Sequence, residues 1–151
     1  CRNNLCISHV KRRKINREVN LALRPEGALL IRAMPEKGQL NAAQPMWLWE
    51  GMNLIGCTSG IKKGIRNNVL YKVVKVESES LVVKGGEEVT LSFPQVAALL
   101  RLSYARTYAS CQGTEFDDEL RLHDTSNRHF TMRHLFVGMS RCKDRRKLDI
   151  A

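Results

Sequence analysis

Long hydrophobic runs are missing from this sequence of 151 residues. The longest apolar runs, 28–31 and 96–100, are far too short for a helix that crosses a bilayer. The first residues also show no signal-peptide pattern. We therefore expect a soluble, intracellular protein that has no membrane partner.

Paired cysteines are missing as well. The five cysteines are odd in number and form no Cys-x-x-Cys pair, so neither a disulfide framework nor a ribbon-type zinc site is indicated. A reducing compartment fits this pattern better. His123, His129 and His134 could join Cys142 around a metal, but their spacing matches no familiar zinc arrangement. We expect no metal site.

Acidic residues are in deficit, since 25 Lys and Arg face 15 Asp and Glu and leave a net charge of +10. Such a surplus favours a polyanionic partner, for example nucleic acid. It can equally serve to keep the surface soluble, and charge alone leaves both interpretations open. With 43% hydrophobic and 26% charged residues, the chain has the composition of one globular domain with room for a small insertion.

The first part of the chain alternates between strand and helix patterns. Residues 4–9 suit a buried strand, and residues 28–33 suit a second one after Pro25 and Gly27. Between them, apolar residues recur at near-helical spacing, at Val10, Ile15, Val19 and Leu23. The strand-helix-strand order predicts an α/β domain with a parallel sheet.

The same predicted helix carries five basic residues, Lys11, Arg12, Arg13, Lys14 and Arg17. Neutralised phosphates supply most sequence-independent affinity for nucleic acid, so these residues could line a nucleic-acid path. The other interpretation is one solvated helix face, because charge runs are common in soluble proteins.

The middle of the chain changes character. Residues 34–45 are polar and broken by prolines and a glycine, which predicts a loop. Short β segments follow at 52–57, 69–76, 80–83 and 89–91. Closely spaced strands with turn signals predict a small antiparallel barrel or sheet. Trp47, Trp49 and Tyr71 could stack on unpaired bases, but for the tryptophans we favour packing in a core or a domain seam.

The last third returns to alternating strands and helices. The predicted elements are a short helix at 94–100, a strand at 101–106, a turn with a short helix at 107–116, a strand at 119–123, a helix at 131–139 and a strand at 147–150. Four polar residues fall at or beside the ends of these elements, Thr107, Gln112, Glu115 and Arg141. Side chains and freed backbone groups can contact a ligand there, which predicts an anionic ligand site.

Two of these segments resemble helicase motifs. Residues 107–117, TYASCQGTEFD, resemble motif V of superfamily 1 helicases, usually T-x-H-K-S-Q-G followed by an acidic residue. Residues 134–142, HLFVGMSRC, resemble motif VI, usually L-Y-V-A-L-S-R-A. Residues 51–91 resemble the barrel inserted in RecD-like helicases, and Ile15-Asn16 resembles a pair in motif IV. The chain thus resembles the second RecA-like domain of the UvrD/RecD group.

The resemblance implies an α/β fold in two parts. A RecA-like parallel-sheet domain would comprise residues 1–45 and 94–151, and a small Src-homology-like antiparallel β-barrel would be inserted at 46–93. It implies an ATP-dependent helicase whose partner is single-stranded nucleic acid, DNA rather than RNA. The sequence holds no G-x-x-x-x-G-K-S/T phosphate loop. We therefore expect a first motor domain elsewhere in a longer protein to bind most of the ATP and Mg²⁺, and this chain alone to be inactive.

The resemblance also assigns roles. Arg141 would be the catalytic arginine finger and would bind ATP together with Gln112, Gly113 and Glu115, while Thr107 would contact a nucleic-acid phosphate. Each could instead be a turn, cap or surface residue. Ala109-Ser110 replaces the usual His-Lys pair of motif V, so the contacts of that pair are not carried over. The alternative function is a non-catalytic nucleic-acid-binding module with remnant helicase motifs.

Overall fold

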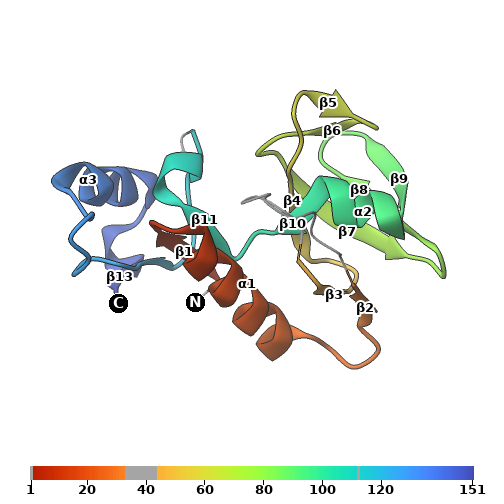
Figure 1. Ribbon diagram of the computed structural model, residues 1–151, viewed down its shortest axis with the longest axis horizontal. Helices are drawn as coiled ribbons and strands as arrows, with labels where there is room; N and C mark the ends of the chain where they lie inside the picture. Colours follow the sequence, from red (N-terminus) through yellow and green to blue (C-terminus); the bar gives the residue numbers. More distant parts are fainter. Residues whose placement is uncertain (1, 33–43, 112) are drawn as a thin grey trace. The chain divides into compact units, whose positions relative to one another are not determined.

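The computed structural model describes residues 2–32, 44–111 and 113–151 (Figure 1). The chain forms two compact units, Cys1–Val19 with Tyr104–Ala151, and Asn20–Ser103. We call the first the parallel unit and the second the antiparallel unit. The antiparallel unit is inserted in the sequence between the two parts of the parallel unit, and the boundary at residue 19 falls within helix α1, His9–Leu23.

A four-stranded sheet organises the parallel unit. Its strands lie in the order β11-β1-β12-β13, with all neighbours parallel. Their bounds are Asn3–Cys6 for β1, Ala105–Thr107 for β11, Leu120–Leu122 for β12 and Leu148–Ile150 for β13. In the register, Leu5 lies opposite Arg106 and Leu122. Leu5, Leu120 and Leu122 of these short strands are fully buried, as expected for a sheet whose faces are covered.

The core of the parallel unit includes a 3₁₀ helix, η1 (Tyr108–Cys111), and the ten-residue helix α3 (Met132–Arg141). A second 3₁₀ helix, η2 (Arg145–Lys147), leads into β13. Gly138 lets α3 approach the sheet closely, because a Cβ there would lie 2.6 Å from Cδ2 of Leu122. The buried cluster consists of Leu5, Tyr108, Cys111, Phe116, Leu120, Leu122 and Cys142.

A five-stranded sheet in the order β10-β4-β7-β8-β9 organises the antiparallel unit. The bounds are Asn53–Gly56 for β4, Leu70–Val76 for β7, Ser80–Lys84 for β8, Glu88–Ser92 for β9 and Leu100–Leu102 for β10. Alternate residues of β7 and β8 are buried, as expected when one face of a sheet covers a core. The four strands predicted between residues 52 and 91 are all present.

Three smaller elements complete the antiparallel unit. Strand β2 (Leu29–Ile31) pairs with β3 (Met46–Leu48), and β5 (Ile61–Lys62) pairs with β6 (Ile65–Arg66). Helix α2 (Phe93–Leu99) begins with a capping box, in which Ser92 N–H donates to Gln95 Oε1 and Gln95 N–H donates to Ser92 Oγ. The β5–β6 hairpin and β3 were not predicted from the sequence.

One predicted strand proved to be two. Residues 101–106 were expected to form a single strand, but β10 and β11 belong to different sheets in different units. The chain leaves strand geometry at residues 103 and 104, where the carbonyl of Tyr104 accepts hydrogen bonds from both Asn4 N–H and Asn4 Nδ2. Each half carries an arginine between less polar residues, Leu-Arg-Leu in β10 and Ala-Arg-Thr in β11, so composition gives no clear sign of the break.

The prediction that residues 28–33 continue a parallel sheet was also wrong. Strand β2 pairs antiparallel with β3, and the neighbours of β1 are β11 and β12. The parallel sheet takes its other strands from the last third of the chain instead, because the intervening segment builds a sheet of its own. The predicted loop at 34–45 lies mostly outside the described residues.

The predicted apolar face of α1 was wrong in a similar way. Val10 is 79% exposed, whereas Arg12, Asn16 and Asn20 are buried at intervals of four residues. Asn16 Nδ2 donates to the carbonyl of Ala105 and its Oδ1 accepts from the N–H of Ala105. Burial of this helix face therefore follows hydrogen bonds to strand backbone instead of apolar spacing.

The two compact units do not have the bounds of the predicted domains. Residues 20–32, 44–45 and 94–103 lie in the antiparallel unit, although the sequence suggested that they belong with the parallel sheet. An independent domain at 46–93 stays a prediction. Among the described residues, no helix is long and apolar enough to cross a membrane.

Candidate nucleotide and nucleic-acid site

Thr107 ends strand β11 and begins the segment that resembles motif V. Its Oγ1 accepts the N–H of Ser110 at 3.3 Å and lies 3.0 Å from Ser110 Oγ, which donates in turn to the Thr107 carbonyl. These bonds close the single turn of η1, and Thr107 is only 6% exposed. The threonine hydroxyl is therefore used in shaping the turn.

A tight turn follows η1. Thr114 N–H donates to the Cys111 carbonyl at 3.0 Å, and Gly113 has φ +76°. A Cβ on Gly113 would meet nothing within 4 Å, so the left-handed backbone alone favours glycine there. Gln112, predicted to bind ATP, lies outside the described residues.

A short backbone bridge joins this turn to the end of α3. Phe116 N–H donates to the Arg141 carbonyl at 2.7 Å, and Lys143 N–H donates to the Phe116 carbonyl at 3.1 Å. Glu115 is the residue before this bridge on one segment, and Arg141 is its first residue on the other. The structure thus brings together the backbones beside two of the predicted ATP-binding residues, which lie 26 positions apart in the sequence.

The carboxylate of Glu115 faces an ammonium group. Lys143 Nζ lies 3.6 Å from Glu115 Oε2 and 2.6 Å from Asp117 Oδ1. The hydrogen bond to Asp117 is the main reason why the pKa of Lys143 is raised, and the charge of Glu115 adds to it. The Glu115 side chain is 61% exposed, so solvent screens this interaction strongly.

Arg141 is the last residue of α3, and its Nε is buried. Nε has no hydrogen-bond partner within the described part of the chain. Burial raises the pKa of the Cys111 thiol, and the charges of Arg141 and Arg106 oppose that rise, so the Arg141 guanidinium lies near Cys111. An unsatisfied buried donor on a cationic group is a place where an anionic oxygen can bind favourably.

Arg106 supports the turn and was missed in the sequence. It is 3% exposed in strand β11, its Nη1 donates to Thr114 Oγ1 at 2.9 Å, and its guanidinium carbon lies 5.9 Å from the centre of the Phe116 ring. A single arginine in the three-residue strand Ala-Arg-Thr gave no signal of this role. It fixes both sides of the turn that carries Glu115.

Thr107 and Arg141 lie toward opposite ends of the strands of the parallel sheet. Thr107 is at the carboxyl end of β11. Helix α3 follows the carboxyl end of β12 and leads back to the amino end of β13, and the Phe116–Cys142 bridge precedes both strands. The Phe116–Cys142 bridge, which adjoins Glu115 and Arg141, therefore lies near the amino ends of β12 and β13, whereas Thr107 lies at the carboxyl end of β11.

A second group of polar residues lies at the carboxyl ends of strands β1 and β12. Asp124 has φ +65°, and its carboxylate accepts the Ile7 N–H at 2.9 Å and Lys11 Nζ at 2.6 Å. His123 Nε2 lies 2.9 Å from Asn4 Oδ1. Burial alone would raise the pKa of Asp124, but the hydrogen bonds from Ile7 and Lys11 outweigh it and lower that pKa.

These contacts reduce the number of basic side chains of α1 that face solvent. Lys11 is paired with Asp124, and Arg12 is 1% exposed. Lys14 and Arg17 are exposed, and Lys14 Nζ is 3.9 Å from Glu18 Oε1. Neither interpretation of the basic run holds for the whole set, because the five side chains have different surroundings.

Aromatic side chains suggested as stacking surfaces are also engaged. Tyr71 is 4% exposed, and Trp47 packs under the guanidinium of Arg24, 4.6 Å from its ring centre. The favoured packing interpretation agrees with the position of Trp47. Among the described residues, no group of three His, Cys, Asp or Glu side chains could hold a metal ion.

No protein-family model matches the sequence, and no curated protein matches it. Solved Pif1 helicases are similar in fold. One, from a study of DNA unwinding at forked double-stranded DNA by two coordinating Pif1 helicases, aligns with 98% of this chain at 18% identity and a TM-score of 0.70.

Two further neighbours show the same likeness. Pif1 from Bacteroides in complex with ADP-AlF3 and single-stranded DNA aligns with 98% of the chain at 19% identity and a TM-score of 0.68. Pif1 from Candida albicans aligns with 98% of the chain at 15% identity and a TM-score of 0.63. The chain spans 38%, 39% and 44% of these three neighbours. The likeness confirms the predicted fold class, a RecA-like parallel-sheet domain with an inserted small antiparallel β-barrel.

Proposed function

We propose that this chain is the second, C-terminal motor domain of a superfamily 1 ATP-dependent nucleic-acid helicase or translocase, with motifs of the UvrD/RecD type. The observation that carries the proposal is the Phe116–Cys142 bridge, which holds the turn with Glu115 against the end of α3 with Arg141. In this way the segments that resemble motifs V and VI would lie side by side. The fold shared with solved Pif1 helicases supports the same assignment.

Arg141 is proposed as the arginine finger. Its guanidinium stays ionised and can donate two parallel hydrogen bonds to phosphate oxygens, which stabilises the charge that develops on a γ-phosphate during transfer. The position of Arg141 at the end of α3, where its carbonyl accepts the Phe116 N–H beside Glu115, supports this role.

The turn before the bridge would complete this half of the ATP site. In the proposal, Gly113 gives the turn its left-handed backbone and Glu115 contacts the nucleotide ribose or a neighbouring motor residue. Gln112 belongs to the same turn by the resemblance of motif V. Arg106 would position the turn, since it is bonded to Thr114 and packs on Phe116.

Single-stranded nucleic acid is the proposed partner, with DNA preferred. The net charge of +10 favours a polyanion, and the solved Bacteroides Pif1 was bound to single-stranded DNA. Thr107 is proposed to lie on that path. Because its hydroxyl is engaged with Ser110, we expect a phosphate contact through the backbone N–H groups of this turn or the shared hydroxyl pair.

The complete site needs a second set of residues. ATP and Mg²⁺ would be bound mainly by a first motor domain of the same protein, which supplies the phosphate loop that this sequence does not contain. We therefore expect the 151-residue chain alone to hydrolyse no ATP.

A non-catalytic nucleic-acid-binding module is the second candidate. Ala109 and Ser110 stand where motif V usually has His-Lys, and the Ser110 hydroxyl is used within η1. A phosphate loop and an acidic Mg²⁺-binding motif upstream in the parent reading frame would distinguish a motor from such a module.

The proposal is tested with Arg141→Lys in the complete protein. The change keeps the charge but removes the planar fork, so ATP hydrolysis at saturating single strand should fall by about 10³-fold or more. Strand binding, titrated on the same preparation, should be nearly unchanged. Arg145→Lys, the same substitution at an exposed site four residues later, is the matched control. Near-normal hydrolysis by Arg141→Lys contradicts the finger role.

A further inference from the structure

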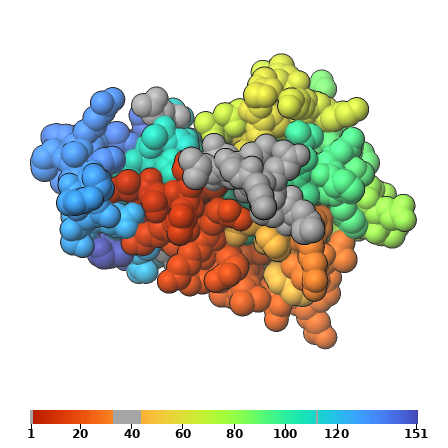
Figure 2. Space-filling view, in the orientation of Figure 1, coloured from red at the N-terminus to blue at the C-terminus, as the bar shows by residue number. Residues whose placement is uncertain are grey.

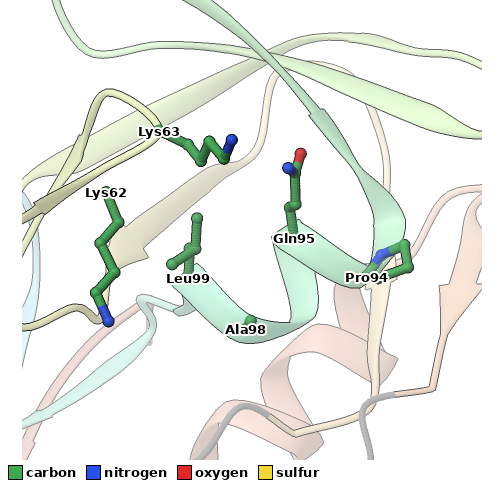
Figure 3. A pocket seen from close by; sticks show the side chains of 6 residues that line it. All are labelled: Lys62, Lys63, Pro94, Gln95, Ala98 and Leu99. Atoms are coloured by element: carbon green, nitrogen blue, oxygen red, sulfur yellow. The ribbon is translucent and has the colours of Figure 1, made fainter.

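A groove lies in the antiparallel unit, between the β5–β6 hairpin and α2. Its volume is about 500 Å³, and Lys62 and Lys63 line one side (Figure 3). Pro94, Gln95, Ala98 and Leu99 of α2 line the other. In Figure 3 the Lys63 side chain extends from the hairpin toward Gln95, and that of Lys62 extends past Leu99. A groove of this size accommodates a few side chains of a ligand.

The hairpin that carries the two lysines is well anchored. The Tyr71 hydroxyl accepts the Arg66 N–H at 2.9 Å, and Ile65 is fully buried. Strand β6 also lies against Gly56, where a Cβ would come 1.9 Å from the Arg66 carbonyl oxygen. The hairpin atoms reach the surface in Figure 2, in yellow. The lysines are thus displayed on a fixed backbone, which lowers the entropic cost of binding a ligand.

The turn of the hairpin is not explained by turn chemistry alone. Lys63 has φ +51° and Gly64 has φ +79°, so both residues of the two-residue loop are left-handed. Asn, Asp or Gly is preferred at the first of these positions, and a lysine there has an unfavourable backbone. Such a residue points to a role for the side chain.

The charges of the groove have one sign. Lys62 and Lys63 are both exposed, and no acidic residue lines the groove. Neither ammonium forms an ion pair with any described residue. Its floor is apolar, with Pro94 and Ala98 beside Leu99. The groove therefore complements a ligand that combines carboxylates with apolar side chains.

We propose that this groove is a docking site for a short acidic and apolar segment of a partner protein. Carboxylates of the segment would pair with Lys62 and Lys63, and one or two apolar side chains would pack on Ala98 and Leu99. Unpaired nucleic acid fits less well, because no aromatic residue lines the groove and bases would have no surface on which to stack. This site is separate from the proposed motor residues.

The test is fluorescence anisotropy with the complete protein and three labelled probes. The first is a pool of 12-residue peptides in which Asp or Glu alternates with Leu, Ile or Phe. The second pool has Gln in place of the acids, and the third probe is a 12-nucleotide thymidine oligonucleotide. Binding of the acidic pool, with at least about tenfold weaker binding of the Gln pool, is the expected result.

Variants locate the binding. Lys62→Glu/Lys63→Glu should weaken binding of the acidic pool at least about tenfold. Ala98→Glu, at an exposed position of α2, should weaken that binding too. Lys72→Glu/Lys84→Glu reverses two other exposed lysines of the same unit, paired across β7 and β8, and should change affinity less than about twofold. The proposal is overturned if the control loses affinity to the same extent, or if the acidic pool does not bind. It is also overturned if only the oligonucleotide binds in a way that depends on the groove residues.

Discussion

Strands β7 and β8 of the antiparallel unit and helix α1 of the parallel unit bury different kinds of residue. In the antiparallel unit, Tyr71 and Val73 of β7 and Leu81 and Val83 of β8 are buried while their neighbours are less so. In the parallel unit, the buried residues of α1 are Arg12 and Asn16. An antiparallel sheet with one wet face produces a regular alternation in the sequence, whereas a helix beside a parallel sheet need not.

The reason for the difference is the edge of the parallel sheet. Strand β11 is the edge strand of the described sheet, so one side of its backbone has no neighbouring strand among the described residues. Asn16 covers that side with two hydrogen bonds to Ala105, at 2.8 and 3.2 Å. Buried backbone groups need partners, and a side-chain amide offers both a donor and an acceptor. Here a polar contact replaces the missing strand.

The largest effect on folding is expected in the antiparallel unit. Leu81 is 0% exposed, so Leu81→Ala should lower the free energy of unfolding by about 2–5 kcal/mol through lost burial and a cavity. Val82→Ala, at the less buried neighbouring position, is the control and should cost less than about 1.5 kcal/mol. Urea denaturation measures both. Equal losses would show that alternation does not govern this unit.

A smaller loss of stability is expected when the contact between Asn16 and Ala105 in the parallel unit is removed. Asn16→Leu leaves the N–H and carbonyl of Ala105 without these partners, which should cost about 2–3 kcal/mol. Arg17→Leu, at the exposed neighbouring position, is the control. Amide exchange at Ala105 should become faster only in Asn16→Leu. A neutral Asn16→Leu would mean that apolar packing can replace the amide.

The smallest loss of stability is expected for Asp124, which follows the carboxyl end of β12, and this loss depends on pH. The folded pKa of Asp124 is lowered, so its contribution is present at neutral pH and is lost as pH falls through the folded pKa, below the ordinary value of 3.8. Asp124→Asn should lower stability by about 1–2 kcal/mol at pH 7. The difference from the parent should shrink toward pH 3 in thermal or urea unfolding.

A surface carboxylate provides the control for this pH dependence. Asp149 is paired with Arg121, but its side chain is 54% exposed. Asp149→Asn should change stability by less than about 0.5 kcal/mol at pH 7. If the two substitutions give the same pH profile, the bonds from Ile7 and Lys11 to Asp124 do not stabilise the fold.

Much of the fold could be predicted because local patterns determine it. The strands β4, β7, β8 and β9 follow alternation and turn residues, and α3 follows its apolar spacing. The break at residues 103 and 104 could not be predicted, since it depends on Asn4, about 100 positions away. The β5–β6 hairpin was missed because a Lys-Gly turn between two-residue strands is a weak signal.

The candidate site divides in the same way. Motif likeness selected Glu115 and Arg141, and the structure brings their backbones together through Phe116. Motif likeness gave no indication of Arg106, because an arginine in a short strand can equally be a surface residue until its partners Thr114 and Phe116 are known. The roles of all five residues stay predictions, namely Thr107, Gln112, Gly113, Glu115 and Arg141.

The most direct test of the central claim is the effect of Arg141 on a transition-state analogue. In the complete protein with Mg²⁺ and single-stranded DNA, ADP with aluminium fluoride mimics the phosphoryl group in transfer, and ADP alone does not. Arg141→Lys should weaken the aluminium fluoride complex by about 10²-fold or more and change ADP affinity by less than about twofold. Arg145→Lys should affect neither ligand. Equal changes for both ligands, or no change, would contradict the assignment of Arg141 as the finger.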